Sequence, residues 1–130
     1  MIVVDASVLA PALADDGVDG DRVRERLRGE QLAAPELIDL EVVSTLRRAA
    51  RAGRLDDRRS GQVLTDLAAL PLRRVQHLPL LSRVWELRDN LTAYDAAYVA
   101  LAEALDALLL TADGPLGRAS GMRCEVEVLG

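Results

Sequence analysis

The chain has 130 residues, half of them apolar, and its 21 acidic side chains outnumber its 16 basic ones to give a formal net charge of −5. This length predicts a single domain over residues 1–130 with one core. No apolar run approaches the roughly twenty residues that a membrane span needs, and the N-terminus has no basic or cleavage pattern, so a cytoplasmic location is expected. One cysteine excludes an internal disulfide, and one histidine excludes a His-rich metal site.

Apolar runs and helical periodicities alternate along the chain. Residues 2–4 predict a strand buried on both faces, followed by a short helix over 8–14 and a second helix that Asp19 or Asp21 caps and Gly29 ends. The later segments, in order, are a strand over 31–34, helices over 37–52 and 55–70, a strand over 72–76, helices over 79–88 and 93–105, a strand over 107–111, a turn or short helix over 115–119 and a strand over 125–129. This alternation predicts an α/β fold of three layers, with a central, mostly parallel sheet of four to five strands flanked by helices.

Aspartates follow the two most apolar strands. Asp5 comes directly after Val3 and Val4, and Asp113 lies two residues beyond the strand over 107–111. In open α/β sheets the binding crevice forms at the carboxyl ends of the strands, where both carboxylates would then lie. Each also has a structural explanation, because Asp5 can cap the next helix and Asp113 sits in a good turn sequence.

Two further acids lie on helices. Glu41 shares a helical face with Leu37 and Ile38, whereas Asp39 points roughly 160° away, so only one of these two acids can face a common site. Asp95 is in line with apolar residues of the helix over 93–105, although Thr92 and Asp95 also fit a capping box. A carboxylate that points into the fold is costly to bury unless it is paired or bound to metal.

The combination of four acids is more specific than any one of them. Several carboxylate oxygens in one crevice, without His or Cys, form a hard-cation site suited to Mg²⁺ or Mn²⁺. Such a site supports phosphoryl chemistry, with Asp5 and Asp95 as the expected direct ligands, Glu41 binding metal or orienting the attacking water, and Asp113 completing the cage.

The arginines and aromatic residues each allow two interpretations. On the helix over 37–52, Arg47, Arg48 and Arg51 are candidates to contact phosphate groups of a nucleic acid, and the alternative is a solvated helix face. Tyr94, Tyr98 and Trp85 could stack on nucleic-acid bases, but because the chain has only three aromatic residues core packing is the safer assignment.

Four segments carry a family resemblance that extends over essentially the whole chain. They are Val-Asp-Ala-Ser-Val-Leu at 4–9, Ala-Pro-Glu-Leu-Ile-Asp-Leu-Glu-Val at 34–42, Leu-Thr-Ala-Tyr-Asp-Ala-Ala-Tyr-Val-Ala-Leu-Ala-Glu at 91–103 and Leu-Leu-Thr-Ala-Asp at 109–113. Together they resemble the PIN-domain ribonucleases, and the length and order of the motifs resemble the VapC-type toxins of bacterial toxin–antitoxin pairs.

The resemblance implies an activity and a set of site residues. Asp5, Glu41, Asp95 and Asp113 would be catalytic and metal-binding, which favours Glu41 over Asp39, with Ser7 and Thr111 as their polar neighbours. The implied reaction is Mg²⁺- or Mn²⁺-dependent endonucleolytic cleavage of RNA, leaving 5′-phosphate and 3′-hydroxyl ends. A homodimer and a small antitoxin that enters the active-site groove are also implied.

Three other classes of protein compete with this interpretation. A phosphoacceptor receiver domain would normally need a lysine, which this chain lacks, and a haloacid-dehalogenase-like phosphatase would want an aspartate where Ser7 stands. The strongest rival is a catalytically silent PIN-like scaffold that binds RNA or a protein partner.

Overall fold

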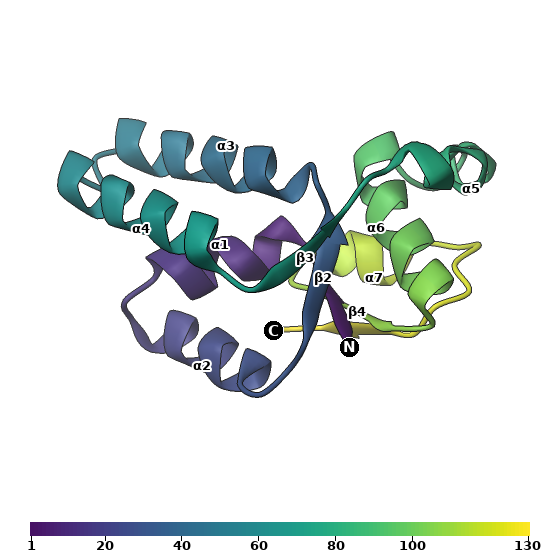
Figure 1. The fold of residues 1–130 in the computed structure, drawn as a ribbon, viewed down its shortest axis with the longest axis horizontal. Coiled ribbons are helices and arrows are strands. Elements are labelled where there is room, and N and C mark those ends of the chain that lie inside the picture. Colours follow the sequence, from purple (N-terminus) through teal and green to yellow (C-terminus); the bar gives the residue numbers. More distant parts are fainter.

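The computed structural model describes residues 1–130 and places a five-stranded sheet between two groups of helices (Figure 1). The strands are β1 (Ile2–Val4), β2 (Leu32–Pro35), β3 (Leu72–Val75), β4 (Leu108–Thr111) and β5 (Val126–Val128). The helices are α1 (Ala6–Ala14), α2 (Val18–Leu27), α3 (Ile38–Arg51), α4 (Asp57–Ala69), the 3-10 turn η1 (Leu78–Leu80), α5 (Leu81–Glu86), α6 (Ala93–Leu105) and α7 (Gly114–Gly117).

The sheet is parallel throughout and runs in the order β3-β2-β1-β4-β5. The chain builds outward from β1 through β2 to β3, then returns to place β4 on the other side of β1. Ile2 is therefore in register with Leu32 of β2 on one side and with Leu108 of β4 on the other. The direction of winding reverses at β1, which is where open α/β sheets form their crevice. The predicted α/β class is confirmed.

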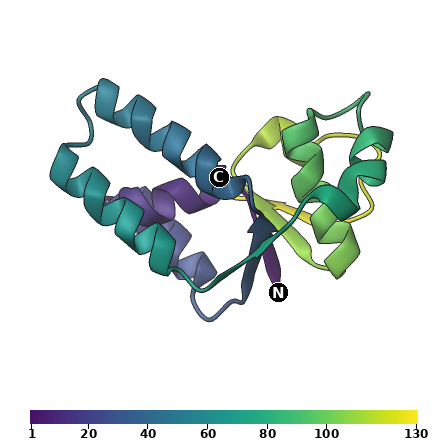
Figure 2. The same ribbon diagram turned by 45° about the horizontal axis from the view of Figure 1, so that its top comes forward.

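The helices cover the sheet in two layers. Helices α1–α4 lie on one side of the sheet, and α5 and α6 lie on the other, in both ribbon views (Figures 1 and 2). The core between them is aliphatic, as a chain without phenylalanine requires, and Tyr98 is its one aromatic member at 1 % exposure. Three layers with β1 and β4 at the centre match the predicted architecture.

The helix ends differ in places from those that the sequence predicts. Helix α1 begins at Ala6 because the Asp5 side chain accepts a hydrogen bond from the Ser7 amide. The N-cap of α2 is Gly17, not Asp19 or Asp21, and no side chain caps it. The segment after Pro79 forms η1 followed by the short α5, so the helix expected over 79–88 is wrong in its extent.

A partly buried ion pair ties the C-terminal segment to the second helical layer. Arg83 of α5 donates to Glu103 of α6 over 2.6 and 3.0 Å, and also to the Gly121 carbonyl over 2.7 Å. Glu103 in turn accepts from the Arg123 amide over 2.7 Å. The loop between α7 and β5 is therefore held by charged hydrogen bonds as well as by packing.

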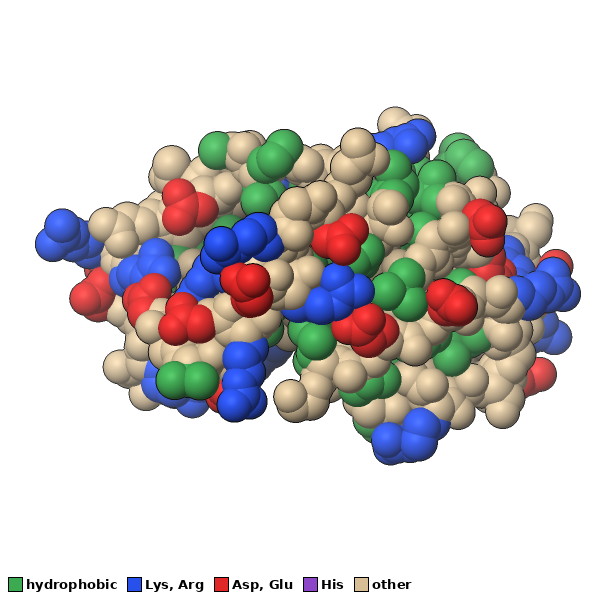
Figure 3. Space-filling model, turned by 90° about the horizontal axis from the view of Figure 1, so that it is seen from below, with side chains coloured by type: hydrophobic (Ala, Val, Ile, Leu, Met, Phe, Trp, Pro, Cys, Tyr) green, Lys and Arg blue, Asp and Glu red, His purple; other side chains and the backbone are tan.

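The surface carries charges of both signs. In the view from below, acidic and arginine side chains lie interspersed rather than gathered into one field (Figure 3). None of the helices has the length and apolar character needed to cross a bilayer.

Candidate active site

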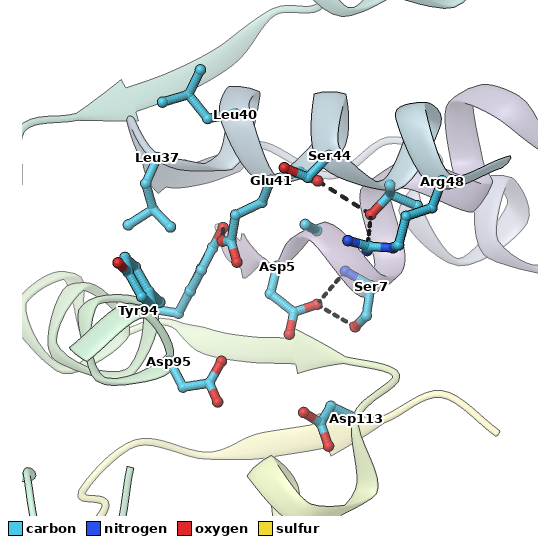
Figure 4. Close-up of a pocket in the computed structure, with 13 residues that line it drawn as sticks. Asp5, Ser7, Leu37, Leu40, Glu41, Ser44, Arg48, Tyr94, Asp95 and Asp113 are labelled. Carbon is cyan, nitrogen blue, oxygen red and sulfur yellow. Dashed lines mark hydrogen bonds between the residues drawn. The ribbon is translucent and has the colours of Figure 1, made fainter. Parts of the chain in front are cut away.

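A pocket of about 520 Å³ opens at the carboxyl ends of β1 and β4 (Figure 4). Thirteen residues line it: Asp5, Ala6, Ser7, Leu37, Leu40, Glu41, Ser44, Thr45, Arg48, Tyr94, Asp95, Tyr98 and Asp113. All four acids of the sequence analysis are among them, and they reach the pocket from the end of β1, from α3, from α6 and from the segment after β4. The fold thus brings together side chains up to 108 positions apart, from 5 to 113.

Asp5 is the most buried of the four, at 6 % exposure. Its Oδ1 accepts from the Ser7 amide over 3.1 Å and from the Ser7 hydroxyl over 2.5 Å, while its Oδ2 accepts from the Thr111 hydroxyl over 2.6 Å. Burial raises the pKa of the Asp5 carboxyl, although these hydrogen bonds oppose that shift. Asp5 therefore caps α1 and lines the pocket at once, so the two explanations do not compete.

Ser7 and Thr111 form a polar bridge between the first turn of α1 and the end of β4. The Ser7 hydroxyl accepts from the Ala112 amide over 2.9 Å, and the Thr111 hydroxyl accepts from the Asp113 amide over 3.0 Å. Asp113 itself caps α7 by accepting from the Leu116 amide over 3.3 Å. This bridge fixes the chain that carries Asp113 relative to Asp5.

Glu41 faces the pocket and Asp39 does not. The Tyr98 hydroxyl donates to Glu41 Oε1 over 2.5 Å, whereas Asp39 pairs with Arg74 of β3 through contacts of 2.8 to 3.1 Å. The pKa of Glu41 is raised, first by burial and then by the negative charges of Asp95 and Asp5, while the Tyr98 hydrogen bond lowers it.

Asp95 is partly buried in the first turn of α6. Its amide donates to the Thr92 hydroxyl over 3.1 Å, and its side chain lines the pocket. Burial and then the charges of Asp113 and Asp5 raise the pKa of Asp95.

The electrostatics of the pocket favour a cation. Asp5 raises the pKa of both Glu41 and Asp95, which means that the carboxylates repel one another across the pocket. No group of three or more Asp, Glu, His or Cys side chains is already drawn together closely enough to hold one ion. The oxygen-only donor set fits a divalent hard cation, and the carboxylates would have to move inward around it.

The structure gives different surroundings to the three candidate arginines, and also to the three aromatic residues. Arg48 lines the pocket and donates to the Thr45 hydroxyl over 3.2 Å, whereas Arg47 and Arg51 are exposed on α3 outside it. The core assignment holds for Tyr98 but is wrong for Tyr94 and Trp85, which are each 67 % exposed.

Sequence reasoning did not assign several lining residues to the pocket, although it placed Leu37 and Thr45 on the helical face of Glu41. Leu37, Leu40, Ser44 and Thr45 supply its α3 wall, and Tyr98 supplies the hydrogen bond to Glu41. Spacing was the available signal for most of them, since Leu37, Ser44 and Thr45 lie three or four positions from Glu41, and Tyr98 lies four from Tyr94. Leu40 directly precedes Glu41, so helical spacing does not place it on the same face.

Residues 2–121 match the PIN domain family, and the chain belongs to that family. Within it, the chain is 42 % identical to ribonuclease VapC9 of Mycobacterium tuberculosis over 129 residues, which cover 99 % of this chain and 98 % of the relative. The chain is accordingly of the VapC type.

Solved structures agree with this assignment at the level of the fold. The crystal structure of PAE2754 from Pyrobaculum aerophilum superposes with a TM-score of 0.66 at 27 % identity, covering 98 % of this chain and 83 % of that one. A toxin–antitoxin complex from Klebsiella pneumoniae superposes with a TM-score of 0.59 at 17 % identity, covering 87 % of each chain.

Proposed function

We propose that residues 1–130 act as one domain, a metal-dependent endoribonuclease and the toxin of a toxin–antitoxin pair. The observation that carries the proposal is the convergence of Asp5, Glu41, Asp95 and Asp113 on one open pocket of a VapC-type PIN domain. Similarity to a relative named as a ribonuclease over nearly the whole chain supports the same activity.

The four carboxylates would bind Mg²⁺ or Mn²⁺, with Asp5 and Asp95 as direct ligands. Such an ion polarises a phosphate oxygen and lowers the pKa of a bound water. Hydrogen bonds from Ser7 and Thr111 orient the Asp5 carboxylate at the pocket, so the other acids would move toward it around the ion. Glu41, held by Tyr98, is placed to bind the ion or accept a proton from the attacking water, and Asp113 would complete the ligand set. Cleavage in this manner would leave 5′-phosphate and 3′-hydroxyl ends.

The basic residues of α3 would contribute phosphate contacts. Arg48 is the strongest candidate because it lines the pocket, and Arg47 and Arg51 would extend the strip along the helix. Phosphate contacts of this kind raise affinity without selecting a sequence. In a chain with a net charge of −5, these arginines and the bound cation would carry most of the attraction for RNA.

A small antitoxin is the proposed protein partner. The likeness of the fold to a protein solved as a toxin–antitoxin complex supports it. A second groove, of about 840 Å³, runs between α1, α3 and α4 and shares Ala6, Ser7 and Thr45 with the first pocket, so a bound segment would reach the carboxylates. We also propose a homodimer, supported by the exposed apolar side chains of Leu78, Leu81 and Trp85.

The test compares two neighbouring acids on α3. The antitoxin-free protein is incubated with a mixed RNA pool in Mg²⁺, in Mn²⁺ and in EDTA, and so are its Glu41→Gln and Asp39→Asn variants. We expect metal-dependent cleavage by the parent, cleavage reduced at least a hundredfold in Glu41→Gln, and cleavage retained by Asp39→Asn, since Asp39 pairs with Arg74 away from the pocket.

The same experiment separates the enzyme from the rival scaffold. RNA bound by the parent but left intact in both metals would identify a silent PIN-like binding domain. Equal loss of cleavage in both variants would point to damage to α3 and would contradict the role given to Glu41.

A further inference from the structure

Tyr94 is an exposed aromatic side chain on the wall of the carboxylate pocket. It is 67 % exposed and lines the pocket, although a chain with two tyrosines and one tryptophan has few aromatic rings to leave in solvent. Tyr98, four residues later on the same face of α6, is 1 % exposed and holds Glu41. Both residues line the pocket, Tyr98 from within the core and Tyr94 from the solvent-exposed side.

The surroundings of Tyr94 are apolar on one side and acidic on the other. Leu37 and Leu40 of α3 line the same pocket, and Leu40 is 73 % exposed. Figure 4 shows Leu37, Leu40 and Tyr94 on one side of Asp5, while Arg48 lies on the other. An exposed aromatic ring in a pocket that aliphatic side chains also line suits a flat apolar surface, and a nucleobase presents such a surface on either face.

The position of Tyr94 along the chain links this part of the pocket to the chemistry. Tyr94 directly precedes Asp95, so the ring is anchored one residue from a carboxylate of the pocket. A phosphate drawn to a cation at the carboxylates would place a base of an adjoining nucleotide beside the ring. The acidic pocket alone repels RNA, and stacking supplies an attraction that does not depend on charge.

We propose that Tyr94, with Leu37 and Leu40, stacks on a nucleobase next to the scissile phosphate and so positions single-stranded RNA in the pocket. This inference rests on the proposed ribonuclease function. Tyr94 is a positioning residue in this arrangement, since it contacts a base and not the reacting atoms. Stacking on any base requires no hydroxyl, so phenylalanine should replace tyrosine there without loss.

The test measures binding and cleavage on the same antitoxin-free preparations. Fluorescence anisotropy, with Ca²⁺ in place of Mg²⁺, gives the Kd for a labelled single-stranded oligoadenylate and for an abasic oligoribonucleotide of the same length. We expect Tyr94→Ala to weaken oligoadenylate binding about tenfold. Tyr94→Phe should bind as the parent does, and the abasic strand should bind the parent and Tyr94→Ala equally. Leu64→Ala, which removes an exposed apolar side chain of α4 outside the pocket, is the matched control and should not change either Kd.

The outcomes distinguish this inference from the proposed function. If the parent protein cleaves no RNA in Mg²⁺ or in Mn²⁺, both the proposed ribonuclease function and the stacking inference are wrong. A parent that cleaves RNA, beside a Tyr94→Ala variant with unchanged oligoadenylate affinity, overturns the stacking role alone. The stacking role would also be overturned if Tyr94→Ala weakened binding of the abasic strand as much as binding of oligoadenylate. A sedimentation coefficient altered in Tyr94→Ala would place Tyr94 in a contact between protein chains and would overturn the stacking role as well.

Discussion

Tyr98 on α6 donates its hydroxyl hydrogen to Oε1 of Glu41 on α3 over 2.5 Å, and this bond joins the two helical layers across the pocket. The tyrosine is buried and the glutamate is partly buried, so few other partners are available to either group. The bond sets the direction of the Glu41 carboxylate and stabilises its charged form. Each of these effects can be measured separately.

Replacing Tyr98 by phenylalanine should shift the pH dependence of RNA cleavage. The hydrogen bond lowers the pKa of Glu41, so its removal raises a pKa that burial and the charges of Asp95 and Asp5 already raise. Cleavage that needs the ionised carboxylate should then decline at a higher pH on the acid side, and kcat/KM near neutral pH should fall about tenfold, as expected for a lost charge-assisted bond. Rates of cleavage across pH 5–8 check this. If the acid side of the pH profile is unchanged in Tyr98→Phe, Glu41 is not the group whose ionisation limits the rate there.

Asp5→Asn and Asp5→Ala should separate the structural role of Asp5 from its chemistry. Alanine removes the cap of α1 and leaves the buried Thr111 hydroxyl without its acceptor, which should lower the free energy of unfolding by roughly 1–2 kcal/mol. Asparagine keeps an acceptor for the Ser7 amide and avoids a buried charge, so its stability should equal or exceed that of the parent. Urea denaturation gives the stability order, and cleavage should be lost in both. Alanine as stable as asparagine would contradict the bridge described above.

The metal-free protein should become more stable relative to Asp95→Asn as the pH falls. The pKa of Asp95 is raised in the folded state, so its charge opposes folding above that pKa, and the cost disappears once the pH is below its ordinary value of 3.8. Asp95→Asn should therefore be the more stable protein at pH 7, by an amount that shrinks toward pH 4. Thermal unfolding in EDTA across this range checks the sign.

Divalent metal should reverse that order at neutral pH. Mg²⁺ or Mn²⁺ at a hundred times its Kd would stabilise the parent by about 2.7 kcal/mol, whereas a variant lacking a ligand should respond much less. Equal metal-induced shifts in the melting temperature of the parent and of Asp95→Asn would exclude Asp95 as a ligand.

Glu103→Gln tests the ion pair between Arg83 and Glu103, the clamp that holds the C-terminal segment. Burial raises the pKa of Glu103, but the hydrogen bonds from Arg83 and from the Arg123 amide outweigh it, and the net shift is downward. The pair therefore stabilises the fold fully above the ordinary pKa of 4.5 and loses its contribution as the pH falls through the lowered value. At pH 7 the variant should lose roughly 2 kcal/mol, and hydrogen exchange should accelerate around Gly121.

Glu86→Gln is the matched control for that prediction. Glu86 also pairs with Arg83, over 3.1 Å, but its side chain is 56 % exposed. Its loss should change the free energy of unfolding by no more than about 0.5 kcal/mol. Equal effects of the two substitutions would contradict a clamp that depends on burial.

The sequence predicts the ends of the strands better than it predicts the walls of the site. Asp5 and Asp113 could be located because each follows an unmistakable apolar run, and parallel strands bring their carboxyl ends together. The sequence around Asp39 could not predict its ion-pair partner, because Arg74 lies 35 residues away on β3. Helical periodicity could not distinguish the exposed Tyr94 from the buried Tyr98 either, because it places both residues on one face of α6. Only the distance that α6 extends beyond the core decides which ring is covered.

The order of the strands also bears on how the protein is made. β1 is synthesised first but receives its neighbour β4 only after residue 108, and Thr111 and Asp113 follow directly. A nascent chain still short of these residues lacks both the hydroxyl that holds Asp5 and the fourth carboxylate. The pocket can therefore be assembled only after residue 113 has been synthesised, and a chain truncated before that point lacks it.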